Sequence, residues 1–117
     1  MPTTSRGREG EDRAAEALEK AGMKIVARNF RMQGGEIDII ATDDDVLVFV
    51  EVKAWSSFGI DNLAYSVNAE KQSRIIETAK YFVCTNRQYE RMAIRFDVVF
   101  VGKEGITHLA SAFMETV

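Results

Sequence analysis

The run VLVFVEVK at residues 46–53 constrains the fold of this chain more than any other segment. Its residues are mostly β-branched or aromatic, and the apolar pattern is nearly continuous instead of alternating with polar residues. Strands of this kind are covered on both faces, so we expect 46–53 to be a central strand. The run ends with an acid and a lysine, Glu51 and Lys53. Polar chemistry is therefore expected where a buried strand ends.

The remaining segments predict two helices and four further strands. Helical composition with a glycine stop marks 9–22, and apolar residues at helical spacing mark a second helix from about Asn68 to Thr85. Strands are expected at 24–30, 36–42, 94–101 and 106–110. The chain then forms a single α/β domain, 1–117, in the order α-β-β-β-α-β-β, with a mixed sheet of about five strands flanked by helices. A right-handed helical crossover makes the third and fourth strands parallel neighbours or near neighbours.

Composition excludes several classes of protein. The longest apolar run is five residues, 46–50, which is too short to cross a bilayer, so no membrane association is expected. The N-terminus has no apolar segment typical of a secretory signal, and the lone Cys84 cannot form an internal disulfide, which together favour a reducing, cytoplasmic location. A net charge of −3 does not suit a protein that coats DNA by charge alone.

The acidic residues gather in one stretch, and strand geometry brings some of them together. Asp43, Asp44 and Asp45 are expected to form a solvated turn within a four-residue loop, 43–46. Across such a hairpin, facing residues have numbers that sum to 89. Asp38 is then opposite Glu51 and Glu36 is opposite Lys53, so one face carries three carboxylates and an ammonium.

Two carboxylates on adjacent strands repel each other, and something should compensate for the repulsion. A divalent cation such as Mg²⁺ between Asp38 and Glu51 would do so, since it takes few protein carboxylates and keeps several waters. Lys53 could then stabilise charge that develops on a phosphate. The structural alternative makes Asp38 a salt-bridge partner of Lys53 and Glu36 a cap of the glycine turn.

Glu11 is the fourth acid of interest. It falls on the apolar stripe of the first helix, near Leu18, whereas Asp12, Glu16 and Glu19 point elsewhere. A carboxylate on a packed stripe needs a partner, and a metal site at the edge of the sheet is one candidate. The alternative is that Glu11 lies in a frayed, solvated helix end.

The segments GEIDIIA (35–41) and VFVEVK (48–53) resemble the motif of the PD-(D/E)xK nuclease superfamily, and the whole chain is similar to the YraN family within it. The longer match includes GREGEDRAAEALEKAG, RNF at 28–30, FG at 58–59, KQSRIIETAKYF and RFDVVFV. The resemblance implies a restriction-endonuclease-like fold, Mg²⁺ or Mn²⁺ held by Asp38 and Glu51, and Lys53 as the catalytic lysine. Glu11 would match the helix acid of archaeal Holliday-junction resolvases, and Glu36 would be the family's extra acid.

Basic and aromatic residues complete the expected site. Lys71 and Arg74 lie at the start of the second helix, where they could contact backbone phosphates or simply form a solvated face. Three more arginines lie before or on the first helix and could flank a DNA path: Arg6, Arg8 and Arg13. Trp55 replaces a basic residue of the relatives and would either stack on a base or pack in a loop.

The leading hypothesis is a metal-dependent nuclease that hydrolyses phosphodiesters of DNA, including branched, flapped or single-stranded forms. The cation would lie between Asp38 and Glu51, with the backbone carbonyl of Val52 as a third ligand, and a two-fold dimer would suit a junction substrate. The alternative is a non-catalytic nucleic-acid-binding accessory protein with the same fold, and a weaker third hypothesis is a structural interaction protein. His108, among apolar neighbours, is expected to be structural.

Overall fold

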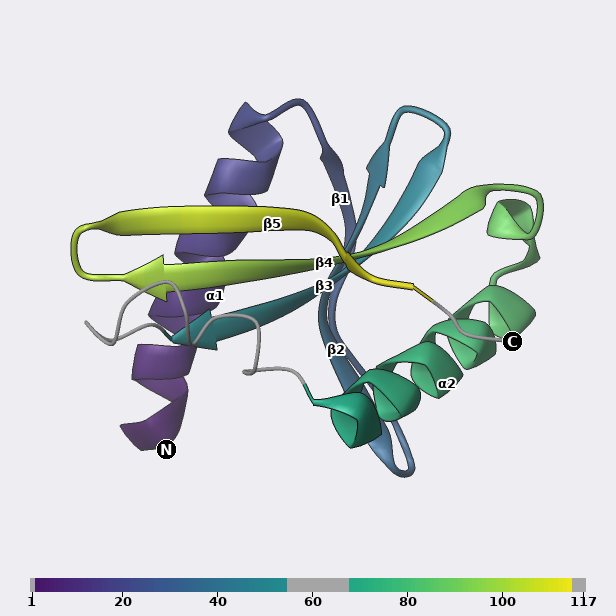
Figure 1. Ribbon diagram of the computed structural model, residues 1–117, viewed down its shortest axis with the longest axis horizontal. Helices are drawn as coiled ribbons and strands as arrows, with labels where there is room; N and C mark the ends of the chain where they lie inside the picture. The colour runs from purple at the N-terminus through teal and green to yellow at the C-terminus, as the bar shows by residue number, and fades with distance from the viewer. Residues whose placement is uncertain (1, 55–67, 115–117) are drawn as a thin grey trace.

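The computed structural model describes residues 2–54 and 68–114, with side chains from residue 8 onward (Figure 1). Its element order is α-β-β-β-α-β-β, as predicted, with one short 3₁₀ helix added before the fourth strand. The elements are α1 (Pro2–Lys20), β1 (Lys24–Met32), β2 (Gly35–Asp43), β3 (Val46–Ala54), α2 (Ala69–Thr85), η2 (Arg87–Tyr89), β4 (Ala93–Gly102) and β5 (Gly105–Phe113). The main differences from expectation are that α1 begins seven residues before Glu9 and that β5 is longer at its C-terminal end.

The five strands follow the chain order across the sheet, β1-β2-β3-β4-β5. β3 and β4 are parallel neighbours, as the helical crossover predicted, and the other pairs are antiparallel. In the β2–β3 hairpin the pairs run from Ile39↔Val50 to Asp43↔Val46, which confirms the predicted sum of 89. The pairing continues one step further than expected, so the turn is Asp44-Asp45 alone and Asp43 belongs to β2. Asp44 has a φ of 53°, a conformation that Asp tolerates in tight hairpin turns.

The two helices cover opposite faces of the sheet, and β3 contributes to both cores (Figure 1). Leu47 and Phe49 pack on the α2 side with Phe82, whereas Val48 and Val50 pack on the α1 side. Because successive residues of a strand point to opposite faces, a strand buried on both sides must be apolar throughout. This explains the continuous apolar run and confirms its central position.

Local signals fix both helices next to the sheet. α1 ends at Lys20, and Gly22, which has a φ of 99°, terminates it in a Schellman motif in which Met23 N–H donates to the carbonyl of Leu18. α2 begins after Asn68, whose side chain accepts a hydrogen bond from Lys71 N–H at 2.9 Å. Neither helix in the described ranges combines the length and apolar character that a membrane crossing requires.

Candidate metal and nucleic-acid site

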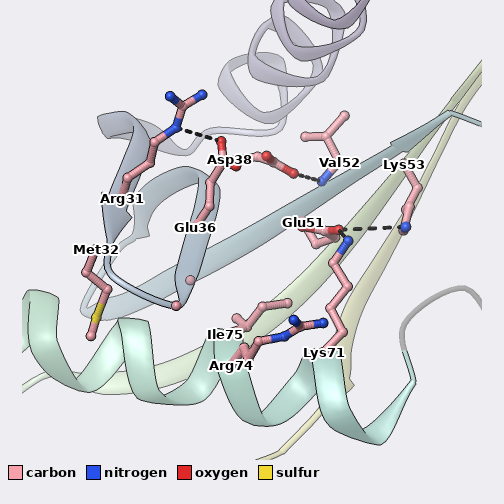
Figure 2. A pocket seen from close by; sticks show the side chains of 12 residues that line it. Arg31, Met32, Glu36, Asp38, Glu51, Val52, Lys53, Lys71, Arg74 and Ile75 are labelled. Carbon is pink, nitrogen blue, oxygen red and sulfur yellow. Dashed lines mark hydrogen bonds and ion pairs between the residues drawn. The ribbon is translucent and has the colours of Figure 1, made fainter.

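A pocket of about 540 Å³ opens between the β1–β2 hairpin, the C-terminal end of β3 and the first turns of α2 (Figure 2). Chain topology creates it, because β3 ends beside the helix that follows the crossover. Its lining combines the acids and bases expected from sequence with two glycines and apolar walls: Arg31, Met32, Gly34, Gly35, Glu36, Asp38, Glu51, Val52, Lys53, Lys71, Arg74 and Ile75. Three of the four predicted acids and the predicted lysine therefore line one pocket.

Asp38 and Glu51, here called the acidic pair, lie side by side in this pocket. Glu51 is buried, with 7 % of its side chain exposed, and Asp38 Oδ2 accepts a hydrogen bond of 2.7 Å from Val52 N–H. Burial, together with repulsion from Glu51, raises the pKa of Asp38 to about 8, and the charge of Glu11 adds to the effect. The predicted repulsion between the two carboxylates is therefore present, and near neutral pH Asp38 relieves it by holding a proton.

Two lysines face the acidic pair and share one oxygen of Glu51. Lys53 Nζ is 4.0 Å from Glu51 Oε2, and Lys71 Nζ is 2.5 Å from the same atom. Burial, and then the neighbouring ammonium of Lys71, lowers the pKa of Lys53. Burial would also lower the pKa of Lys71, but its hydrogen bond and ion pair with Glu51 outweigh burial and raise it. The structural alternative paired Lys53 with Asp38, whereas the ion pair that Lys53 forms in the structure is with Glu51.

Glu36 lies at the mouth of the pocket and does not meet Lys53. The regular β2–β3 pairing ends at Ile39↔Val50, so neither of the two predicted facing pairs, Asp38–Glu51 and Glu36–Lys53, belongs to the ladder. Asp38 and Glu51 still interact through their side chains. Glu36 is instead opposite Arg31 of β1, which donates to its Oε2 at 3.2 Å. Arg31 lines the pocket and was missed from sequence, although the hairpin register across the Gln33-Gly34 turn would have found it.

Glu11 is held by β1 and does not line the pocket. Its Oε1 is 3.4 Å from an Arg28 guanidinium nitrogen, and 17 % of its side chain is exposed, so the expectation of a frayed, solvated acid is wrong. Arg28 also contacts Asp12 at 2.7 Å, and this hydrogen bond raises the pKa of Arg28. Glu11 nevertheless lies near enough to act on Asp38 through its charge.

The predicted basic residues divide into two groups. Lys71 and Arg74 line the pocket, whereas Arg8 and Arg13 lie on α1, away from it. The side chain of Arg6 and all of Trp55 lie outside the described residues, so those two predictions stay open. The sequence analysis did not predict that Lys71 contacts Glu51. The position of Lys71 in the first turn of α2, next to the end of β3, is the signal that could have predicted this contact.

The donor set suits a hard divalent cation with few protein ligands. Among residues 8–54 and 68–114, no group of three or more His, Cys, Asp or Glu side chains is arranged around a common metal position. Asp38 and Glu51 supply two carboxylates that repel each other, and Mg²⁺ and Mn²⁺ accept such a pair together with water. The amide of Val52 contacts Asp38, and a role for its carbonyl remains a prediction.

Comparison with known proteins gives a consistent family relationship. The model of the "Uncharacterised protein family UPF0102" matches residues 10–101. A UPF0102 protein of Treponema pallidum (strain Nichols) is 44% identical, covering 92% of this chain and 91% of the relative. UPF0102 proteins of Dechloromonas aromatica and Persephonella marina are 41% and 39% identical, covering 95% and 92% of this chain and 90% and 92% of their own lengths. The span matched by the family model covers the positions of the acidic pair and its two lysines, and the chain belongs to the UPF0102 family.

Proposed function

We propose that this protein is a metal-dependent nuclease that hydrolyses phosphodiester bonds of DNA. The observation that carries the proposal is the acidic pair, in which Asp38 and Glu51 repel each other in a pocket that four basic side chains also line. Buried carboxylates with strongly shifted pKa values mark functional sites more often than structural ones. The resemblance of the surrounding segments to the PD-(D/E)xK motif supports the same reaction class.

The charged residues of the pocket have roles that follow from their positions. Asp38 and Glu51 would hold Mg²⁺ or Mn²⁺, which supplies a Lewis acid to activate water and offset phosphate charge. Lys53 lies next to Glu51, and its ammonium stabilises the negative charge that develops on phosphate oxygens in the transition state. Glu36 and its partner Arg31 form the rim on the hairpin side.

Basic side chains in the pocket lining would position the DNA backbone. Arg74 is exposed, and no ion pair joins it to any other residue whose side chain the structure describes. Arg31 approaches the same pocket from the hairpin, opposite α2. A phosphate chain passing between them would be held from two sides, as expected for sequence-independent contacts.

The test is a cleavage panel on linear, single-stranded, flapped and four-way-junction DNA, with Mg²⁺, with Mn²⁺ and with neither. We expect wild type to cut at least one DNA form only when metal is present, and Asp38→Asn and Glu51→Gln to lose at least about 100-fold in rate. Asp45→Asn is the matched control, because it removes an exposed carboxylate from the β2–β3 turn. Absence of cleavage of every DNA form with both metals would refute the nuclease.

The accessory-protein alternative keeps one supporting observation. Four basic side chains line the pocket, enough to bind a phosphate chain without hydrolysing it: Arg31, Lys53, Lys71 and Arg74. If wild type binds DNA in low salt but never cuts it, this alternative replaces the nuclease. If it neither binds nor cuts, a structural interaction protein is the better description. Sedimentation of the protein with and without a four-way junction tests the two-fold dimer in the same samples.

A further inference from the structure

Lys71 pairs with Oε2 of Glu51, and both residues line the pocket. Its ammonium is 2.5 Å from Glu51 Oε2, whereas Lys53 is 4.0 Å from the same oxygen. Figure 2 shows Lys71 reaching up from α2 to the carboxylate, while Lys53 reaches it along β3. Glu51 is buried, so its charge must be balanced by partners and not by water. Lys71 is the closer of these two balancing cations.

A cation held between Asp38 and Glu51 would need the carboxylate that Lys71 now contacts. Two positive charges on one carboxylate oxygen repel each other, and a divalent cation also adds its full charge beside Lys53. A cation at this carboxylate would add a third positive charge beside the two ammonium groups that already share Oε2, and the repulsion is strongest for the nearer ammonium, that of Lys71. In the structure Lys71 contacts Glu51, whereas Oδ2 of Asp38 accepts a hydrogen bond from Val52 N–H.

The position of Lys71 allows its side chain to leave Glu51 without any change in the fold. Its backbone is fixed in the first turn of α2 by the Asn68 cap. Its side chain is 35% exposed and has a flexible stem, so the ammonium can turn toward the open pocket. Arg74 is three residues further along the same helix and lines the same pocket, so a released Lys71 would lie beside it.

We propose that Lys71 is a built-in counter-ion that divalent cations displace from Glu51, and that the released ammonium then binds substrate phosphate. This rests on the proposed function, because it needs a metal position between Asp38 and Glu51. Metal binding and DNA binding then reinforce each other through one side chain. By linkage, DNA that captures the released Lys71 also tightens metal binding by the same factor.

Metal titration of the DNA-free protein tests the displacement directly. Isothermal titration with MnCl₂ alone is carried out on wild type, Lys71→Met and Lys71→Gln, the last of which keeps a polar donor without the charge. We expect both variants to bind Mn²⁺ about 10-fold more tightly than wild type, because the competing ammonium is gone. Lys80→Met is the control, since it removes one lysine charge from the solvent side of the same helix, and its affinity should stay within twofold.

The coupling between metal binding and DNA binding is measured as the affinity for a labelled DNA with and without Mg²⁺. The measurement uses Lys53→Ala protein, which is expected to cleave the DNA slowly. Mg²⁺ should raise DNA affinity severalfold when Lys71 is present and have little effect when Lys71→Met is added. Circular dichroism of each variant shows that α2 is still folded. A Lys71→Met or Lys71→Gln protein that binds Mn²⁺ no more tightly than wild type would overturn the proposal.

The outcomes separate this proposal from the nuclease itself. If wild type binds Mn²⁺ and loses that binding in Asp38→Asn, while the Lys71 variants bind it no more tightly, only the displacement is refuted. If wild type and every variant fail to bind Mn²⁺, both the metal position and the displacement are refuted. If only the Lys71 variants bind Mn²⁺, the displacement is supported in its strongest form.

Discussion

Asp38 of β2 and Asp97 of β4 lie on the two strands that flank β3, Asp38 half-buried and Asp97 completely buried, yet their hydrogen-bond surroundings are opposite. Asp97 of β4 is fully buried and accepts hydrogen bonds from three neighbours, namely Arg95 (2.9 and 3.0 Å), His108 Nε2 (2.7 Å) and Ser111 N–H (3.0 Å). Asp38 accepts one from Val52 N–H and faces Glu51. Asp97 is thus surrounded by hydrogen-bond donors, whereas Asp38 has one donor and a second carboxylate beside it.

The two surroundings shift the two pKa values in opposite directions. Burial alone would raise the pKa of Asp97, but the hydrogen bonds from His108, Arg95 and Ser111 N–H outweigh it and lower the pKa. For Asp38, burial and Glu51 act together and raise it. An acid whose hydrogen-bond donors are all present stabilises the fold. An acid that lacks such donors can still bind an added cation.

The largest expected effect comes from removing the charge of Asp97, the carboxylate that is surrounded by hydrogen-bond donors. Asp97→Asn should destabilise the protein by about 3–5 kcal/mol, because Arg95 and His108 lose the charge they balance inside the sheet. Urea unfolding at pH 7 measures the loss. Asp44→Asn, on the exposed turn, is the control and should stay within about 0.5 kcal/mol of wild type. A loss below about 1 kcal/mol in Asp97→Asn would mean that the network is dispensable.

The second effect concerns rate instead of stability. Lys53→Ala should lower single-turnover cleavage by about 10²–10³-fold while DNA affinity changes only a few-fold, because a group aimed at transition-state charge adds little to ground-state binding. Cleavage at saturating protein and filter binding on the same DNA measure the two quantities. Equal losses in rate and affinity would make Lys53 a binding residue and favour the accessory-protein alternative.

The third effect is a change in how stability depends on pH. Asp38 has a folded-state pKa raised above its unfolded value, so its stabilising contribution is complete below about pH 4 and is lost as pH rises through about 8. Asp38→Asn cannot ionise, and its side-chain oxygen can still accept from Val52 N–H. Without metal, the variant should exceed wild type by on the order of 2 kcal/mol at pH 9.

Thermal melts of both proteins from pH 5 to pH 9 test this prediction. Asp97 supplies the contrast, because its lowered pKa keeps its contribution intact above pH 4 and removes it only in stronger acid. Stability curves of wild type and Asp38→Asn that remain parallel from pH 5 to pH 9 would contradict the raised pKa of Asp38.

The smallest expected effect is at the rim of the pocket. Arg74→Ala should weaken DNA binding a few-fold on all sequences and reduce the slope of affinity against salt by about one, as for a single phosphate contact. Binding across a salt series measures it, and Arg91→Ala, an exposed arginine that does not line the pocket, is the matched control. An unchanged slope would remove Arg74 from the DNA path.

The hairpin register shows how much of the site could be predicted from sequence. The alternation in 36–42, the length of the run 46–53 and a short turn between them were enough to place Asp38 near Glu51, because strand pairing leaves few alternatives once both faces are assigned. The apolar run likewise predicted β3 as a central strand. These features depend on periodicity within a short segment, which sequence carries directly.

What sequence could not supply were contacts between distant segments. Lys71 reaches Glu51 across the crossover, and Arg95 joins Asp43 to Asp97, so Asp43 is half-buried and ion-paired where a solvated turn was predicted. The expectation that His108 is structural agrees with its bond to Asp97. Helix rotation and sheet twist decide such contacts, and neither is encoded by the spacing of apolar residues.

The close approach of Gly35 to α2 makes an uncharged position important for the pocket. A Cβ added at Gly35 would overlap the hydroxyl of Thr78, which is itself held by the carbonyl of Arg74 at 2.7 Å. The absence of a side chain thus sets the separation between the hairpin that carries Asp38 and the helix that carries Lys71. A larger residue there would push the two walls apart and misalign every charged group between them. In a mutational survey, Gly35 would behave like an active-site residue although it contributes no chemistry.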